Sequence, residues 1–266
     1  MIRARIITGA LFGGVLISVI LLLSTPLAAV VLGALWILGA WEWAGLASLH
    51  AGWRILYAAA CAACMVALYL LGDSRVLDAL LIVALASLLL ALVAVLTYPR
   101  KLGMATVGAA GFIALVPSWL LLVWLHSTEP PLGRALAMTV LAIVWAADVG
   151  AYTFGRTFGR IKLAPAVSPG KTWEGVTGGV VSAAAAAWVA AIFIGLPAGP
   201  LLALGVSTAL ASVVGDLAVS VFKRNVGLKD TGTLLPGHGG VMDRIDSLIA
   251  AIPVFVFGLM LARIVV

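Results

Sequence analysis

The sequence predicts an all-α, polytopic membrane protein with about nine transmembrane helices, its N-terminus in the cytoplasm and its C-terminus outside. Three observations lead to this prediction. Only 10% of the 266 residues are charged and 64% are hydrophobic, whereas soluble domains have about 25% charged residues. The mean hydropathy is +1.22. Apolar runs long enough to cross a bilayer, which takes about 20 residues each, recur along the whole chain and leave no room for a separate soluble domain.

Nine apolar runs, separated by turn-rich linkers, give the expected spans. They lie near residues 6–24, 27–48, 54–72, 76–97, 103–125, 134–154, 175–195, 199–221 and 246–265. The first run could be mistaken for a cleaved signal peptide, but the hydrophobicity continues beyond it, so we expect a retained span. We expect a single integral-membrane domain, 1–266. The spans within residues 1–130 would form a scaffold, and residues 131–266, with the two inner loops, would form the catalytic half.

The distribution of basic residues sets the expected orientation. With the N-terminus inside, 13 of the 16 Lys and Arg residues fall on the inner side: Arg3, Arg5, Arg54, Arg100, Lys101, Arg156, Arg160, Lys162, Lys171, Lys223, Arg224, Lys229 and Arg244. Cytoplasmic loops carry such an excess. The net charge of +6 therefore suits anionic lipid head groups or anionic soluble substrates, and not nucleic acid.

Two inner loops are long, 155–174 and 222–245, and both are rich in glycine, proline and basic residues. We expect the functional site there. "SPGKT" (168–172) resembles part of a Walker A motif, but the motif needs a glycine at position 165, which is proline, and we expect no strand before it. Cys61 and Cys64, with no second pair and no nearby histidine, are interpreted as packing residues. The spacing of Gly175 and Gly179 predicts close helix packing.

Several acidic residues lie inside apolar segments or at their ends. They are Glu42, Asp148, Asp216, Asp243 and Asp246. A carboxylate at the bilayer centre costs about 2.5–3.5 kcal/mol, so such residues face a bundle interior, a water-filled cavity or a counter-ion. Each could form a structural ion pair or belong to a functional cluster. Glu42 could tie the N-terminal half to the site, or pair with Arg54 or Arg100.

The spacing of these residues favours a functional cluster. Polar residues recur four, four and three positions apart in one helix, and so share a face: Ser212, Asp216, Ser220 and Lys223. Asp243 and Asp246 are three apart and can also project from one face. Carboxylate oxygens without a cluster of His and Cys indicate a hard divalent cation, Mg²⁺, and not zinc.

Carboxylates beside Lys and Arg are the groups used in phosphoryl or nucleotidyl transfer. The glycines of "GHGG" (237–240) let backbone N–H groups approach a phosphate, and His238 could orient a phosphate or shuttle a proton. These residues together predict a site at the membrane surface that takes a soluble polyphosphate and a lipid phosphate entering laterally.

The stretch "SVFKRNVGLKDTGTLLPGHGGVMDRID" (220–246) resembles the signature of phosphatidate cytidylyltransferases (CDP-diacylglycerol synthases), with every fixed position present. "DVGAYTFGRTFGR" and "SPGKTWEG" are similar to two further blocks of that family, and the resemblance is dense over about 148–246. It implies that CTP and phosphatidate react to CDP-diacylglycerol and pyrophosphate, with Mg²⁺ and with potassium as the candidate second ion. It also implies a bacterial inner membrane, with the active site facing the cytoplasm.

The resemblance assigns roles to individual residues. Asp216 and Asp243 would hold metal, with Asp148 and Asp246 in or next to the cluster. The other catalytic residues, which would contact phosphates, are Lys223, Arg224, Lys229, His238 and Arg244. The substrate-binding residues would be Ser168, Lys171, Thr172, Glu174, Ser220, Asp230, Gly239 and Gly240.

Two alternatives remain open. One is a related membrane enzyme that uses another lipid phosphate or nucleotide. The other is an ion-coupled transporter, which predicts broken helices in corresponding positions of two halves; instead, the polar loops lie in the C-terminal half, on one side. Small-residue helix faces would permit a homodimer.

Overall fold

The structure, a computed structural model, describes residues 2–234 and 239–265, with residues 2–8 as backbone only. Nine helices and one two-stranded hairpin occur in these residues. They are α1 (Ile2–Leu22), α2 (Thr25–Leu46), α3 (Ala51–Leu71), α4 (Ser74–Leu96), α5 (Met104–Ser127), α6 (Leu132–Phe158), β1 (Lys162–Ala164), β2 (Ser168–Thr172), α7 (Trp173–Ile194), α8 (Ala198–Asn225) and α9 (Met242–Leu261).

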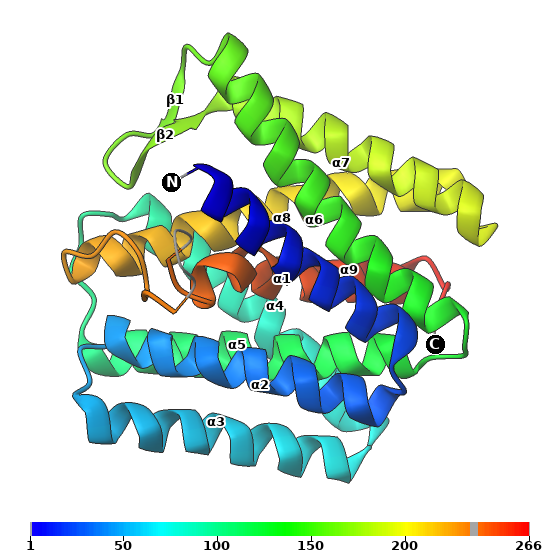
Figure 1. The fold of residues 1–266 in the computed structure, drawn as a ribbon, viewed down its shortest axis with the longest axis horizontal. Helices are drawn as coiled ribbons and strands as arrows, with labels where there is room; N and C mark the ends of the chain where they lie inside the picture. Colours follow the sequence, from blue (N-terminus) through cyan, green and yellow to red (C-terminus); the bar gives the residue numbers. More distant parts are fainter. Residues whose placement is uncertain (1, 235–238, 266) are drawn as a thin grey trace.

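The prediction of a helical, multi-pass membrane protein is confirmed. By length and composition, eight helices, α2 to α9, could cross a membrane. In α1, the apolar segment Gly9–Leu22 is shorter than these spans. The start of α1 and the end of α9 lie at opposite ends of the bundle (Figure 1), as an odd number of consecutive antiparallel helices requires.

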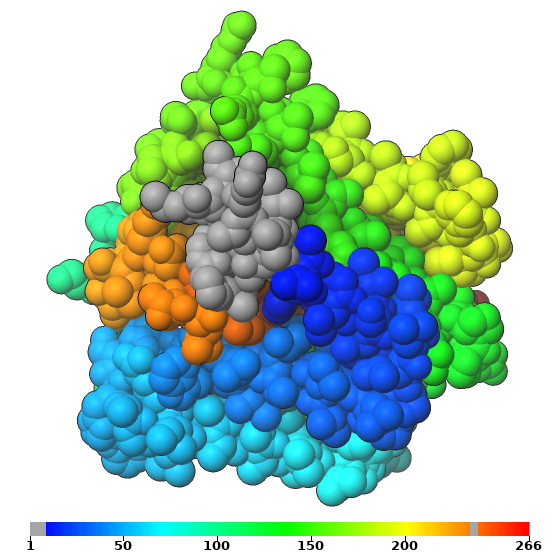
Figure 2. All heavy atoms as spheres, viewed as in Figure 1, coloured from blue at the N-terminus to red at the C-terminus, as the bar shows by residue number. Residues whose placement is uncertain are grey.

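Helices α8 and α9 occupy the middle of the bundle. They pack against each other, α8 also packs against α7, and α9 also packs against α5. In Figure 1, α6 and α7 lie on one side of this central pair, and α2, α3 and α5 lie on the other. The same view in space-filling form shows α1 and α2 over much of the visible face (Figure 2). The central pair is therefore held between two groups of helices.

Buried tryptophans join α2 to α5. The Trp36 indole N–H donates to Ser118 Oγ at 2.9 Å, and the Trp43 indole N–H donates to the Val107 carbonyl at 2.7 Å. A buried indole N–H needs an acceptor, because no water reaches it. Such bonds between membrane helices contribute about 0.6 kcal/mol each on average, so they set the register of α2 and α5 more than they stabilise the bundle.

Small residues bring α6 and α7 into close contact, as the glycine spacing predicts. A Cβ atom on Gly175 would lie 2.9 Å from the Ala151 carbonyl oxygen, and one on Gly179 would lie 2.8 Å from that of Ala147. Either contact would force the backbones apart. These glycines therefore fix the position of α6, which carries Asp148.

Helices and strands extend further into both inner loops than the sequence indicates. Helix α6 continues to Phe158, α8 continues to Asn225, and α9 begins at Met242, so that Asp243 is helical. The loop 155–174 contains the antiparallel pair β1–β2, in which Lys162 lies opposite Thr172. The expectation that no strand precedes "SPGKT" is therefore wrong. The segment is one arm of a hairpin, which differs from the strand–loop–helix context of a Walker A motif.

Thr172 joins the hairpin to α7. It is the N-cap residue of that helix, and its Oγ1 accepts a hydrogen bond from the Gly175 N–H at 3.1 Å. A threonine cap contributes about 1 kcal/mol. The cap fixes the direction in which β2 runs into the helix, and with it the position of the neighbouring Lys171.

Candidate functional site

A polar cavity of about 640 Å³ lies between α6, α7, α8, α9 and the hairpin, a size typical of small-molecule sites. Nine charged residues line it: Asp148, Arg156, Lys171, Asp216, Lys223, Asp230, Asp243, Arg244 and Asp246. The C-terminal half of the chain thus brings both signs of charge together inside an otherwise apolar bundle.

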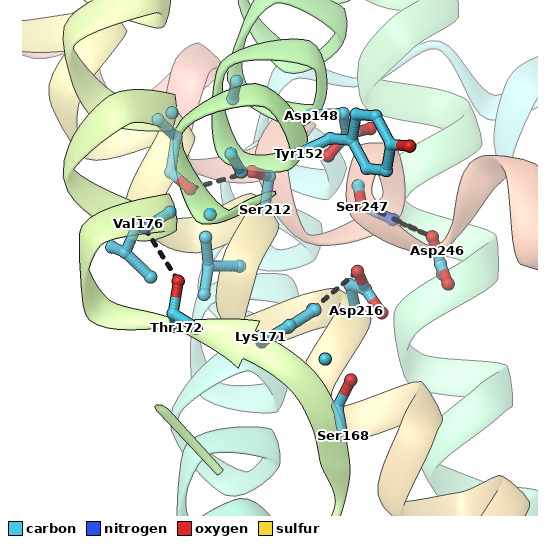
Figure 3. A pocket seen from close by; sticks show the side chains of 18 of the residues that line it. Asp148, Tyr152, Ser168, Lys171, Thr172, Val176, Ser212, Asp216, Asp246 and Ser247 are labelled. Atoms are coloured by element: carbon cyan, nitrogen blue, oxygen red, sulfur yellow. Dashed lines mark hydrogen bonds and ion pairs between the residues drawn. The ribbon is translucent and has the colours of Figure 1, made fainter. Parts of the chain in front are cut away.

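An ion pair between the hairpin and α8 crosses the cavity (Figure 3). Lys171 Nζ, from β2, lies 2.6 Å from Asp216 Oδ2, and both side chains are about one-third exposed, at 27% and 32%. Ser220 Oγ donates to the other oxygen of Asp216 at 3.4 Å. Because both partners remain accessible to water, the pair itself adds little to stability, and it can open for a ligand.

Two further carboxylates face the same space. Asp148 on α6 and Asp246 on α9 interact electrostatically with Asp216 and with each other. Ser212, Asp216 and Lys223 all line the cavity, which confirms that the polar residues of α8 share a face. Asp243 and Asp246 also line it together, as their spacing of three predicts. Three helices thus direct carboxylates at one point.

Asp243 closes the signature loop onto α8 and α9. Its Oδ1 accepts from Lys223 Nζ at 2.9 Å, and its Oδ2 accepts from the backbone N–H groups of Thr231 and Gly240, both at 2.9 Å. The side chains of Asp243 and Lys223 are only 7% and 11% exposed. Removing one partner of such a buried pair leaves the other charge uncompensated, at a cost of about 3–5 kcal/mol.

Glu42 ties the N-terminal half of the chain to this loop. Its Oε2 accepts from the Met242 N–H at 2.8 Å and from Thr231 Oγ1 at 3.1 Å, while its Oε1 is buried without a hydrogen-bond partner. Of the two roles left open for this residue, the structure selects the link to the site. Among the residues that the structure describes, no ion pair joins Glu42 to Arg54 or Arg100.

The two described glycines of the "GHGG" segment are required by close contacts. Gly239 has a φ of +84°, in the region that favours glycine, and a Cβ there would lie 2.8 Å from Asp243 Oδ2. A Cβ on Gly240 would collide with the Glu42 carboxylate and with Thr231 Oγ1. These glycines therefore let the loop approach two acidic side chains, whatever they do with a phosphate.

The structure brings most of the sequence-predicted residues to the cavity but not all of them. Ser168, Lys171, Thr172, Asp230 and Arg244 line it, whereas Lys229 is exposed and is not one of the lining residues. His238 lies outside the described residues.

Arg224 and Glu174 hold the hairpin instead of lining the cavity. Arg224 Nε donates to the Val167 carbonyl at 3.2 Å, and its Nη1 donates to the Leu228 carbonyl at 2.9 Å. Glu174 Oε1 accepts from the Ile161 N–H at 3.1 Å. Both residues thus position the elements that carry Lys171 and Lys223.

Sequence reasoning missed Tyr152 and Arg156. Both lie on α6, about one and two turns C-terminal to Asp148, and both line the cavity. Arg156 Nη1 donates to the Tyr152 hydroxyl at 2.6 Å. Their signal was present in the sequence: residues 148, 152 and 156 are spaced by four and so share one helical face. Ser247, which donates its N–H to Asp246 Oδ1 at 2.7 Å, was missed as well.

The chemistry of the oxygen donors fits a hard cation. Asp148, Asp216 and Asp246 offer carboxylate oxygens, which Mg²⁺ prefers. Within the described residues, however, no group of three or more His, Cys, Asp or Glu side chains is arranged to hold a metal, and the ammonium group of Lys171 lies against Asp216. A bound cation would therefore require Lys171 to move.

The fold and the cavity define a multi-pass membrane protein whose charged cavity, lined by carboxylates and cations, is suited to phosphate groups. The chain matches the model of the "Cytidylyltransferase family" over residues 3–262, and it belongs to that family.

Two curated relatives cover nearly the whole chain, and a third covers more than half of it. A phosphatidate cytidylyltransferase of Pseudomonas aeruginosa is 45% identical over an alignment of 269 positions, which covers 96% of this chain and 96% of that protein. The Haemophilus influenzae protein of the same name is 38% identical over 96% of this chain and 97% of its own length. One from Brucella suis is 44% identical over 58% of this chain and 56% of its own.

Proposed function

We propose that this chain is a phosphatidate cytidylyltransferase, which transfers the cytidylyl group of CTP to phosphatidate and releases pyrophosphate. The observation that carries the proposal is the cavity in which Lys171 and Lys223 meet the carboxylates of Asp148, Asp216 and Asp246 among apolar helices. Its support from outside the structure is the shared name of two relatives that match 96% of the chain.

The chain's own residues suit this chemistry. The phosphate of phosphatidate is ionised at neutral pH, so it needs no strong base to act as a nucleophile. One of its oxygens forms a bond to the α-phosphorus of CTP. The bond from that phosphorus to the oxygen bridging to the β-phosphate breaks in line, and pyrophosphate leaves with the electron pair. Lys171, Lys223 and Arg244 would neutralise the approaching anions and position them, which supplies most of the catalysis.

The proposal includes Mg²⁺, held by Asp148, Asp216 and Asp246 with Asp243 beside them, and potassium as the second ion. When bound, Mg²⁺ would neutralise the charge that develops on the phosphate oxygens. Asp243 already accepts three hydrogen bonds, so we assign it first to holding the loop and Lys223, and only then to the metal.

We also propose that the protein lies in the inner membrane of a bacterium with its cavity open to the cytoplasm. The support is that the charged cavity lies at the end of the bundle where the basic loops 155–174 and 222–245 lie, and cytoplasmic loops are enriched in Lys and Arg. A homodimer stays a prediction.

The test is pyrophosphate release by purified protein in detergent–phosphatidate micelles, with each nucleoside triphosphate in turn. We expect release with CTP alone, and background rates when EDTA removes Mg²⁺ or when diacylglycerol, which lacks the phosphate, replaces phosphatidate. Release with another nucleotide would indicate a related enzyme. No release with any nucleotide, from folded protein supplied with lipid, would contradict the proposal and favour an ion path.

A further inference from the structure

A second cavity, of about 560 Å³, lies between α4 and α5 on one side and α8 and α9 on the other. We call it the α4–α9 groove. Small side chains create much of it, including Ala94 on α4, Ala110 on α5 and Gly215 on α8. Only 11% of the most apolar stretch of α4 is buried inside the protein, so α4 lies at the outer edge of the bundle, where the lipid phase is next to the groove. Its size is within the roughly 300–1,000 Å³ range of ligand sites.

Two cations lie at the mouth of the groove. Arg100 and Lys101 line it, and both are exposed. Their loop is fixed to the end of α8: the Leu102 N–H donates to Asn225 Oδ1 at 3.1 Å, and Asn225 Nδ2 donates to the Leu102 carbonyl at 2.8 Å. The two cations are therefore held next to the end of α8 that carries Lys223, and their charge is complementary to an anionic head group.

The groove and the polar cavity meet at Asp246. This residue lines both cavities, and it is 8% exposed. A molecule lying in the groove can thus place one end beside the carboxylates and ammonium groups of the polar cavity while the rest stays among apolar side chains. A nucleotide does not fit these walls, because burying its polar groups there without partners would be costly.

We propose that the α4–α9 groove binds the acyl chains of a lipid phosphate, with Arg100 and Lys101 contacting its head group. This inference rests on the proposed function, since it names the place where the lipid substrate of that reaction enters. It predicts that the N-terminal half, through α4 and α5, contributes directly to recognition of the lipid.

The first experiment fills the groove. Ala94→Phe places a ring in it, and the matched control is Ala86→Phe, on the same helix at an exposed position outside the groove. Because the acyl chains already lie among hydrocarbon before they bind, the ring acts by filling space that a chain would occupy. It should raise the KM for dioleoyl phosphatidate about tenfold, within the range expected for overpacking an apolar contact. We expect little change for dihexanoyl phosphatidate or for CTP, and wild-type values throughout for Ala86→Phe.

The second experiment removes the cations at the mouth. The double variant Arg100→Gln/Lys101→Gln should raise the KM for phosphatidate at both chain lengths by about tenfold, as expected for lost contacts to an anionic head group. Arg75→Gln, at an exposed position at the start of α4 and so at the other end of that helix, is the matched control and should behave as wild type.

A binding measurement separates this inference from the proposed function. Phosphatidate that carries a diazirine near the end of one chain should cross-link to α4, α5, α8 or α9, and unlabelled phosphatidate should suppress this labelling while phosphatidylcholine should not. Equal competition by phosphatidylcholine, or labelling elsewhere, would show that the groove is not the binding site of the lipid phosphate, even in an active enzyme. Specific labelling of a protein that releases no pyrophosphate would instead contradict the proposed function and still support lipid binding in the groove.

Discussion

Asp243 combines two tasks in one carboxylate. One oxygen neutralises Lys223, and the other gathers two backbone N–H groups of the signature loop. An asparagine of the same shape can accept only through its single carbonyl oxygen, and its NH₂ group would face either the ammonium group or the two N–H donors. The charge and the loop geometry would thus be lost together.

We therefore predict that Asp243→Asn lowers turnover below about a tenth of the wild-type rate, while the protein still expresses and inserts. The measurement is CTP-dependent pyrophosphate release, made below the melting temperature of the variant. Asp78→Asn, an exposed acid in α4, serves as the matched control and should leave the rate unchanged. Activity of Asp243→Asn above that level would refute the role.

At the scale of single residues, the sequence predicted which acidic residues lie at the cavity better than it predicted which groups each residue contacts. The acids in apolar segments stand out because charge there is costly, and four of the five line the polar cavity. The partners of Glu42 lie 189 and 200 residues away, and those of Arg224 and Glu174 are backbone groups. No local spacing reports such contacts, so their roles could not be predicted.

The close packing of α6 against α7 holds Asp148 at the cavity. We predict that Gly179→Ala destabilises the protein by about 1–3 kcal/mol, the usual cost of overpacking, because the new methyl group meets a backbone carbonyl that cannot turn aside. The measurement is the thermal unfolding midpoint in detergent.

Gly199→Ala is the control for that experiment. A Cβ at this helical position meets nothing within 4 Å, and alanine is favoured over glycine in a helix by up to about 1 kcal/mol. We expect an unchanged or slightly higher midpoint. Equal midpoints for the two variants would show that α6 and α7 can separate freely.

The spans could be predicted from the sequence because apolar length reports them directly. The hairpin could not, because β1 has three residues and β2 contains a proline and a glycine, which weaken any strand pattern. The start of α9 was placed four residues late, at 246 instead of Met242, because charged residues occupy its first turn. Such helix ends depend on contacts, here with Glu42, and not on hydropathy.

The orientation of the whole molecule in the membrane stays a prediction, which rests on its basic loops. With the N-terminus inside, the sequence assigns 13 of the 16 basic residues to the cytoplasmic side, and four of them line the polar cavity. Alkaline phosphatase becomes active only when it is exported from the cytoplasm. We therefore predict that alkaline phosphatase fused after Leu261 is active and that the same fusion after Leu96 is inactive. The opposite pattern would place the cavity outside, away from cytoplasmic CTP.

The division into a scaffold, 1–130, and a catalytic half, 131–266, also stays a prediction at this scale. The structure adds two places where the halves meet: the hydrogen bonds of Glu42 and the α4–α9 groove. If the groove holds the lipid, the first half would supply substrate recognition as well as support.

The long reach of the Glu42 hydrogen bond has a consequence for biosynthesis. Its partner Met242 is 200 residues further along the chain, which a ribosome adding about 5–20 residues per second reaches only after roughly 10–40 s. During that time Glu42 Oε2 lacks the donors that it has in the finished protein. A chain that stops before α9 would keep this carboxylate without the Met242 N–H, so α2 reaches its final hydrogen bonding only when synthesis is nearly complete.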